Sequence, residues 1–175
     1  MSISLIACVS KNMGLGIGNE LLFEINHDLQ NFQQHTKGNI VICGRKTFDS
    51  IIERNGKPLS DRVTVLLTRN KKYKKQFNEF VFHDIESILK GIKTMGENDK
   101  KVFVIGGAEV YKLLLPYISE ILLTVVDKYV EEADTFYPIG LQNELGFTEV
   151  SNAEHYSEEY NCNYSFKRYI KSNDK

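Results

Sequence analysis

Three mainly apolar segments of the chain each lead into glycine, and this repeated junction limits the folds open to the sequence. Residues 4–10, 39–43 and 101–105 have the length and composition of buried strands, and each is followed within four residues by one or more glycines. Strands that alternate with helices predict a mostly parallel sheet covered on both faces. Ligands of such sheets bind at the carboxyl ends of the strands, so the pattern favours a nucleotide-sized ligand.

The remaining segments extend this alternation of helices and strands. Further strands are expected over residues 62–68 and 121–126, and the alternating residues of 147–151 and 164–170 predict an antiparallel hairpin at a sheet edge. Helices are expected over residues 26–35 with Asn26 as the N-cap, from Phe48 to 53, after Asp84, and from Gly107 to Pro116. The basic run at residues 71–75 is expected to be a solvated loop.

Length and composition narrow the class of protein. The 175 residues predict a single domain over residues 1–175, and 42% hydrophobic content is that of a globular protein. A formal net charge of −1 gives no electrostatic reason to expect nucleic acid or a membrane as a partner. No apolar run is long enough for a bilayer, and the first residues do not resemble a secretory signal. Three cysteines without CxxC spacing indicate reduced thiols and no metal site, in a cytoplasmic protein.

The glycine-rich segment 14–18 superficially matches a dinucleotide-binding fingerprint. That motif, GxGxxG, would need a third glycine where the chain has Asn19, and no helical pattern begins there. Three glycines without a packing stripe instead predict a mobile lid that can close over a ligand.

Asp28 allows two interpretations from its position alone. It precedes Phe32 by four residues, so it borders the apolar face of its predicted helix. Facing water, it would be a first-turn acid that suits the helix dipole. Facing inward, it would need a hydrogen-bonding partner, and a cationic or amidine-like ligand edge would satisfy both of its oxygens.

Two junctions have the residues of an anion site. Gly44 to Thr47 places two cations and a hydroxyl where a strand turns into a helix, and Thr68 and Arg69 end the next strand. Gly106 and Gly107 permit a close backbone approach to a pyrophosphate at the start of another helix. Together these junctions favour a phosphorylated ligand.

In this order, these motifs resemble the dihydrofolate reductase family over most of the chain. The segments that carry the resemblance are residues 4–7, 16–23, 28–32, 44–48, 50–51, 57–59, 62, 104–111, 123–124 and 134–138. Each motif alone has low specificity, but the series in register is highly specific.

The resemblance implies an α/β fold with a central mixed, mostly parallel sheet of about eight strands, an antiparallel C-terminal edge hairpin, and four helices flanking both faces. It also implies NADPH-dependent reduction of 7,8-dihydrofolate to 5,6,7,8-tetrahydrofolate, in one-carbon and thymidylate metabolism. Antifolates such as methotrexate or trimethoprim would be inhibitors. We expect a monomer.

The resemblance assigns Asp28 and Phe23 to the catalytic centre. Asp28 would contact the 2-amino group and N3 of the pterin, and Thr124 would hydrogen-bond its carboxylate. Arg62, with Lys57 nearby, would bind the glutamate tail of the substrate. The other substrate contacts that it implies are Ile6, Ala7, Leu29, Phe32, Ile51, Leu59, Ile105 and Tyr111. Because no second acid is apparent near Asp28, we expect water to deliver the proton to N5.

The resemblance also implies three groups of cofactor contacts. Those for the adenosine phosphates are Gly44, Arg45, Lys46, Thr47, Thr68 and Arg69. Those for the pyrophosphate are Gly106, Gly107, Ala108, Glu109, Val110 and Tyr111. Those for the nicotinamide are Ala7, Gly14, Leu15, Gly16, Ile17, Gly18, Asn19 and Glu20.

The chain departs from the commonest family pattern at several positions. Leu22 and Phe23 stand where Pro-Trp is usual, Ala133 where glycine usually precedes Asp134, and residues 60–61 (Ser-Asp) where Pro-Gly is usual. The segment from residue 52 to 55 is also longer. None of these changes removes a chemical group that the reaction needs.

Three other functions are weighed against this one. A reductase of a riboflavin-pathway aminopyrimidine would share the cofactor site, but its ribose-phosphate substrate has no glutamate tail for Arg62. A nucleotide-binding module without catalysis would need neither Asp28 nor Thr124. Nucleic-acid binding through residues 71–75 would rest on one charged patch without interleaved aromatic residues.

Overall fold

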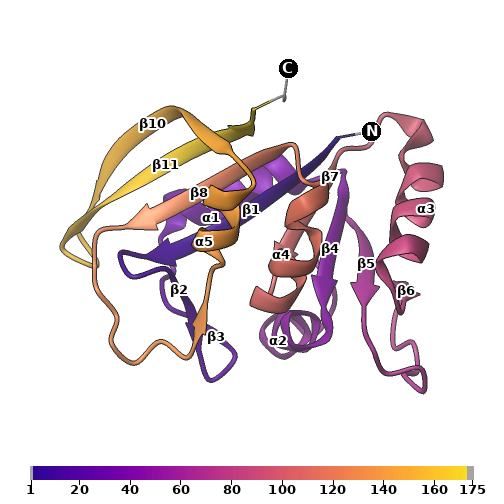
Figure 1. Ribbon diagram of the computed structural model, residues 1–175. Coiled ribbons are helices and arrows are strands. Elements are labelled where there is room, and N and C mark those ends of the chain that lie inside the picture. The colour runs from indigo at the N-terminus through magenta and orange to yellow at the C-terminus, as the bar shows by residue number, and fades with distance from the viewer. Residues whose placement is uncertain (1, 173–175) are drawn as a thin grey trace.

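The computed structural model describes residues 2–172, in which eight strands form one sheet of order β10-β11-β8-β1-β7-β4-β5-β6 (Figure 1). These strands are β1 Ile3–Ser10, β4 Ile40–Gly44, β5 Val63–Leu67, β6 Phe80–Phe82, β7 Val102–Gly106, β8 Glu120–Val126, β10 Phe147–Ser157 and β11 Cys162–Lys171. The five pairings from β8 across to β6 are parallel. Both pairings of β11 are antiparallel. The predicted mixed sheet with its antiparallel edge hairpin is therefore confirmed.

The helices lie on both faces of this sheet, as Figure 1 shows for α1 behind it and for α4 and α5 in front. Their bounds are α1 Asn26–Thr36, α2 Arg45–Asn55, α3 Ile85–Met95, α4 Ala108–Leu114 and α5 Ile139–Glu144, with 3-10 turns at Gly96–Asn98 and Leu115–Tyr117. The described residues thus hold five α-helices, not four, because the six-residue α5 was not predicted.

The side chains of strand β1 point alternately to the two faces of the sheet. Leu5 and Val9 are fully buried in the cluster that also holds side chains of α3 and α4. Cys8, on the opposite face, packs in a second cluster with Phe23 and Tyr164. Asp28, described below, lies next to Cys8 on this second face.

The N-cap of α1 and the first residue of α2 differ from the predictions. α1 begins at the predicted residue, but its N-cap is Ile25, which makes no side-chain cap, so Asn26 is not the cap. α2 begins at Arg45 and not at Phe48, because the backbone becomes helical directly after Gly44. By contrast, the predicted cap of α3 is confirmed, since Asp84 Oδ1 accepts from the backbone N–H of Ser87 at 2.7 Å.

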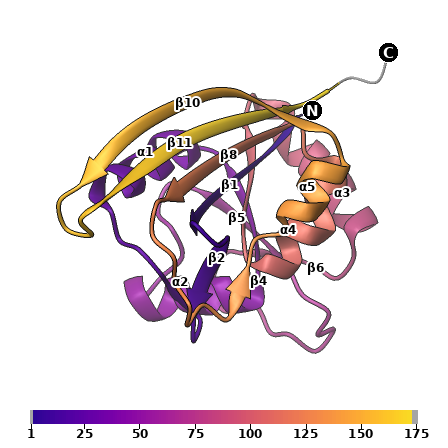
Figure 2. The same ribbon diagram turned by 60° about the vertical axis from the view of Figure 1, so that its left-hand side comes forward.

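The glycine-rich segment is a small sheet and not an irregular loop. β2 Gly14–Ile17 pairs with β3 Glu20–Leu21 and with the distant β9 Thr135–Phe136, in the order β3-β2-β9. Figure 2 shows this sheet beyond the end of β1, near α2. A Cβ at Gly14 would lie 2.8 Å from the Cβ of Ala133. The same Cβ would also lie 2.8 Å from the Ser10 hydroxyl, so position 14 has room only for glycine.

The residues that the structure describes include no helix with the length and hydropathy to span a bilayer.

A buried carboxylate organises the loop that contains the basic run. Glu79 is 1% exposed and accepts hydrogen bonds from the Tyr73 hydroxyl (3.0 Å) and from the backbone N–H groups of Gln76 (2.7 Å) and Phe77 (2.8 Å). Burial raises its pKa, but these hydrogen bonds outweigh burial and hold the pKa below the usual value. The lysines of the run remain exposed, as predicted.

Glu79→Gln is expected to lower the free energy of unfolding by about 1–3 kcal/mol at neutral pH, because it leaves buried donors without a charged acceptor. A depressed folded-state pKa gives stability above the unfolded pKa that is lost as pH falls. The difference between wild type and variant in urea denaturation should therefore shrink below about pH 4. Glu86→Gln, at an exposed pair with Lys90, is the control and should change stability by less than about 0.5 kcal/mol. An equal loss at pH 3 and pH 7 would contradict this account.

Candidate active site

Asp28, in the first turn of α1, faces the sheet, which resolves the two interpretations left open by the sequence. Its Oδ1 accepts a hydrogen bond of 2.6 Å from the hydroxyl of Thr124 on β8, the contact that the resemblance implied. Asp28 is half-buried and Thr124 is buried. A carboxylate held this way is fixed in position yet open enough to meet a ligand.

The surroundings of Asp28 change its acidity. Burial raises the pKa of the carboxyl, whereas hydrogen bonds from Thr124 and Cys8 and the neighbouring His27 lower it, and the balance is a raised pKa. The Cys8 thiol has its own pKa raised well above the usual value, by burial and by Asp28. The protonated thiol therefore acts as a neutral donor beside the carboxylate.

Cys8 was not predicted to belong to the site. The sequence placed it in a buried strand, and a periodicity of two would have put it on the same face as Ile6. Tyr111 of α4 reaches the same region, since its hydroxyl donates a 2.8 Å hydrogen bond to the Ile6 carbonyl. Tyr111 is 4% exposed, and burial raises the pKa of its hydroxyl well above the usual value.

The apolar residues expected to line the pterin pocket come from four elements and a loop. Ile6 and Ala7 of β1 are buried. The half-buried members are Leu29 and Phe32 of α1, Ile51 of α2, Leu59, and Ile105 of β7. Half-burial of large apolar side chains leaves surface that an aromatic ring can cover.

Phe23 is buried and packs edge-on against Tyr160, with ring centroids 5.2 Å apart. The Tyr160 hydroxyl also accepts from the backbone N–H of Glu24 at 2.8 Å. Phe23 shares an apolar cluster with Cys8. These contacts anchor the chain between the small sheet and α1; the place of Phe23 in the catalytic centre, which the resemblance implied, stays a prediction.

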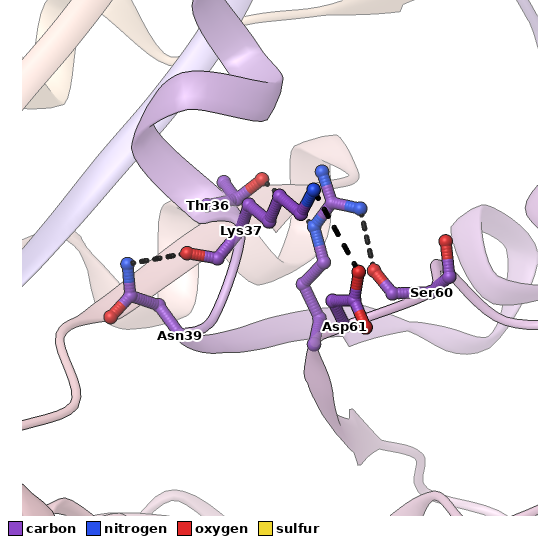
Figure 3. Close-up of polar contacts among 6 residues, drawn as sticks. Thr36, Lys37, Asn39, Ser60 and Asp61 are labelled. Carbon is purple, nitrogen blue, oxygen red and sulfur yellow. Dashed lines mark hydrogen bonds and ion pairs between the residues drawn. The ribbon is translucent and has the colours of Figure 1, made fainter.

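Arg62 is held near the C-terminal end of α1 by polar contacts with Thr36 and Ser60, two of the residues labelled in Figure 3. Its Nε donates to the Thr36 hydroxyl (3.2 Å) and its Nη1 donates to the Ser60 carbonyl (2.7 Å). Burial lowers its pKa, and Asp61 partly opposes this. The guanidinium stays charged and has N–H groups left for an anion. Lys57 is exposed, and no contact in the described chain fixes its amine.

Asp61 explains one departure from the family pattern. Its φ is +58°, in the left-handed region that favours glycine, the residue usual at this position. Its carboxylate lies 3.9 Å from the amine of Lys37, as the dashed line in Figure 3 marks.

The glycine junctions of β4 and β7 lie against each other. A Cβ at Gly44 would lie 2.9 Å from Val110, and one at Gly107 would lie 3.3 Å from the Thr47 hydroxyl. Gly106 has a φ of +118°, and the peptide bond between Gly106 and Gly107 is cis. The carboxyl ends of the two strands thus form one backbone surface on which added side chains would crowd.

The cations expected to bind phosphate surround this surface. Arg45 and Lys46 lie in the first turn of α2 and are exposed, as is Arg69 after β5. Arg45 lies 3.7 Å from Asp49, and Arg69 lies 3.8 Å from Glu109. Thr68 is less available than the sequence suggested, because it is buried and its hydroxyl accepts from the backbone N–H of Asn70.

The small sheet is tied to both of its neighbours. The N–H of Gly18 donates to Asp134 Oδ2 at 2.8 Å. The amide of Asn19 donates to the Lys46 carbonyl (3.0 Å), and the Ser50 hydroxyl donates to the Asn19 carbonyl (3.0 Å). The sequence placed Asn19 and its neighbours against the nicotinamide without indicating these ties to α2.

Groups of three or more His, Cys, Asp or Glu side chains that could hold a metal ion do not occur within residues 2–172. The three cysteines are free.

The site combines a carboxylate on a helix, half-buried apolar side chains, and a glycine surface with exposed cations at the carboxyl ends of parallel strands. This combination is that of an α/β enzyme that binds a ring substrate and a phosphorylated cofactor. Comparison with known proteins identifies the family. A family model for dihydrofolate reductase matches residues 2–171.

Curated relatives agree with this match. The chain is 34% identical to dihydrofolate reductase from Sus scrofa, over 96% of this chain and 97% of the relative, and 31% identical to that of Bacillus subtilis, over 98% and 95%. The dihydrofolate reductase of Staphylococcus haemolyticus is 34% identical over 79% of this chain. Among solved structures, dihydrofolate reductase from Enterococcus faecalis complexed with NADP(H) and RAB-propyl has a TM-score of 0.82 at 25% identity, covering 98% of this chain and 97% of that one.

The chain therefore belongs to the dihydrofolate reductase family. Its activity is the reduction of dihydrofolate, and its cofactor is NADPH. This excludes the riboflavin-pathway and non-catalytic alternatives considered from the sequence.

Proposed function

We propose that Asp28 is the residue that binds and polarises the pterin ring of dihydrofolate. The observation that carries this proposal is a half-buried carboxylate hydrogen-bonded at 2.6 Å by Thr124. A carboxylate can accept two parallel N–H groups, and the 2-amino group and N3 of a pterin offer such a pair. Leu29 and Phe32 on the same helix would then cover the ring.

Asp28 would act on the ring and not on N5 directly. Its negative charge would raise the electron density and therefore the basicity of the ring. Within the described chain, the titratable groups whose pKa depends on Asp28, or which change the pKa of Asp28, are Cys8, His27, Tyr111 and Tyr164. None of them is a second carboxyl group. Water is therefore the proposed source of the proton on N5.

The glycine surface supports binding of a dinucleotide, because Gly44 and Gly107 leave backbone without side chains next to the exposed cations Arg45 and Lys46. Arg45 and Lys46 would hold the phosphate of the adenosine, and the backbone from Gly106 onward would approach the pyrophosphate. When bound, NADPH supplies the hydride.

The small sheet would close the site. Its hydrogen bonds from Gly18 to Asp134 and between Asn19 and α2 hold it over the end of β1. In this position it would exclude bulk water and restrict the space available to the nicotinamide.

Finer assignments follow from the same proposal. Methotrexate and trimethoprim carry diamino-substituted rings and would compete for Asp28. Arg62 would bind the tail carboxylate of the substrate. We also propose that residues 1–175 form one domain, and that the protein is a cytoplasmic monomer without nucleic-acid or membrane partners, in keeping with a net charge of −1.

A spectrophotometric assay tests the proposal. NADPH oxidation by the purified protein should require dihydrofolate and should be blocked by a stoichiometric amount of methotrexate. A riboflavin-pathway aminopyrimidine ribose phosphate is the control substrate and should not support oxidation. Tight NADPH binding together with no binding of any antifolate would contradict the proposed pterin site.

A further inference from the structure

His27, the residue directly before Asp28, makes a contact that the reaction does not explain. Its Nδ1 lies 2.7 Å from the hydroxyl of Tyr164 on β11. Tyr164 is 4% exposed, so this hydroxyl has little access to water as an alternative partner. Two neighbouring residues of α1 therefore reach two strands of the sheet, Asp28 to β8 and His27 to β11.

The C-terminal hairpin supplies three aromatic contacts to His27, which is otherwise exposed. His155 of β10 lies opposite Tyr164 in the strand register, and the two rings stack at 5.5 Å with an interplanar angle of 29°. The His27 ring meets His155 edge-on at 4.7 Å and Phe166 at 4.8 Å. We call Tyr164, His155 and Phe166 the hairpin socket.

The first turn of α1 depends on these contacts. Its N-cap Ile25 gives no side-chain hydrogen bond to the free N–H groups at the helix start. The turn that carries Asp28 is instead attached to the sheet through the hydrogen bonds of Thr124 and Tyr164. These two anchors belong to paired strands, since Tyr164 lies opposite Val126 of β8 and Phe166 lies opposite Thr124. They therefore set the position of the carboxylate as a unit.

We propose that His27 and Tyr164 form a positioning pair for Asp28, in which the hairpin socket fixes the first turn of α1 and keeps an imidazole beside the active carboxylate. The functional part of this inference rests on the proposed role of Asp28. Neither residue is catalytic, because neither is placed against the substrate; each acts through Asp28.

Charge gives the pair a second effect. The groups that face His27 are Asp28 on its own helix, Tyr164 on β11 and His155 on β10. A protonated imidazole favours the ionised form of Asp28, and His27 is among the groups that lower the Asp28 pKa against the larger effect of burial.

Direct titration of Asp28 tests the proposal without relying on turnover. Protein labelled with 13C at the aspartate carboxyl carbons would be followed by NMR against pH, with Asp28→Asn to assign the signal. His27→Asn should raise the titration midpoint of Asp28 by about 0.5 pH unit or more, because a nearby cation is lost. Tyr164→Phe, which removes only the hydroxyl, should move it in the same direction, and the double variant should move it no further than the larger single change.

Tyr156→Phe is the matched control. Tyr156 lies on the same hairpin, is exposed, and bonds Asn161, so its hydroxyl has no contact with α1. The Asp28 midpoint should be unchanged in this variant. Unchanged midpoints in both His27→Asn and Tyr164→Phe, or shifts that simply add in the double variant, would overturn the proposal. If His27→Asn does not fold, Tyr164→Phe with its control decides alone.

The test separates this inference from the proposed function. Full turnover by Asp28→Asn would remove Asp28 from catalysis, yet the midpoint shifts would still establish the pair. Conversely, unshifted midpoints with an inactive Asp28→Asn would leave the pterin site intact and remove only the positioning pair.

Discussion

Asp28→Asn is expected to reduce turnover of dihydrofolate at neutral pH by about a hundredfold or more, the range seen when a polarising group is lost from a reacting centre. The amide keeps the size of the side chain and can still accept from Thr124, so the fold should be preserved. What is lost is the negative charge that would attract the ring N–H groups and raise the basicity of N5. Steady-state and single-turnover rates with saturating NADPH would measure the effect.

The same substitution should stabilise the protein at neutral pH. Burial raises the folded-state pKa of Asp28, so the folded protein holds the ionised carboxylate at a cost that asparagine does not have. The gain, on the order of 1 kcal/mol, should be present above the folded pKa and should decline as pH falls through it and wild-type Asp28 becomes protonated. Urea denaturation at a series of pH values would measure this, and a gain that grows at low pH would have the wrong sign.

Asp127→Asn is the matched control for both measurements. Asp127 is exposed and lies 3.5 Å from the amine of Lys11, a surface pair far weaker than a buried contact. This substitution should change neither the turnover of dihydrofolate nor the pH dependence of the free energy of unfolding. Wild-type turnover by Asp28→Asn would show that Asp28 has no part in the mechanism.

The parts of the fold that could be predicted from the sequence are those specified by local signals. β1, β4 and β7 follow from apolar runs ending near glycine, and α3 follows from an Asp84 cap with an apolar stripe. The start of α2 differs because residues 44–47 were interpreted as the turn between strand and helix, and Gly44 provides no side-chain cap that would mark the helix start. β6 and β9 are too short to give a periodic pattern, so only pairing with distant strands defines them.

The contacts of the site likewise depend on pairings between distant segments, which local sequence signals do not specify. The hydrogen bond between Asp28 and Thr124 was expected only because the resemblance supplied it, since 96 residues separate the partners. Cys8 is brought to Asp28, and Tyr164 to the neighbouring His27, by the sheet order β11-β8-β1, which no local pattern encodes. The orientation of Asp28 itself could not be decided from helical spacing, because both faces of α1 are compatible with a first-turn acid.

Arg62→Leu is expected to weaken dihydrofolate binding by about ten- to a hundredfold, the loss typical of one charge-assisted hydrogen-bonding group. The guanidinium is held by Thr36 and Ser60, and the Thr36 hydroxyl itself donates to the Phe32 carbonyl at 2.9 Å. This arrangement leaves some N–H groups in a fixed direction for a carboxylate, so less side-chain entropy is lost on binding. NADPH binding should be nearly unchanged, because the glycine surface lies at the ends of other strands.

Two comparisons make this prediction specific to the glutamate tail. Trimethoprim has no tail carboxylate, so its dissociation constant should be the same for Arg62→Leu and wild type. Thr36→Val keeps the guanidinium but removes the hydroxyl that orients it, so this variant should weaken the binding of dihydrofolate by a smaller factor than Arg62→Leu. Arg54→Leu, which removes an arginine paired with Glu24 at 2.5 Å, is the control for loss of a positive charge. If Arg62→Leu weakened the binding of dihydrofolate, trimethoprim and NADPH equally, Arg62 would support the fold as a whole and would not bind the tail.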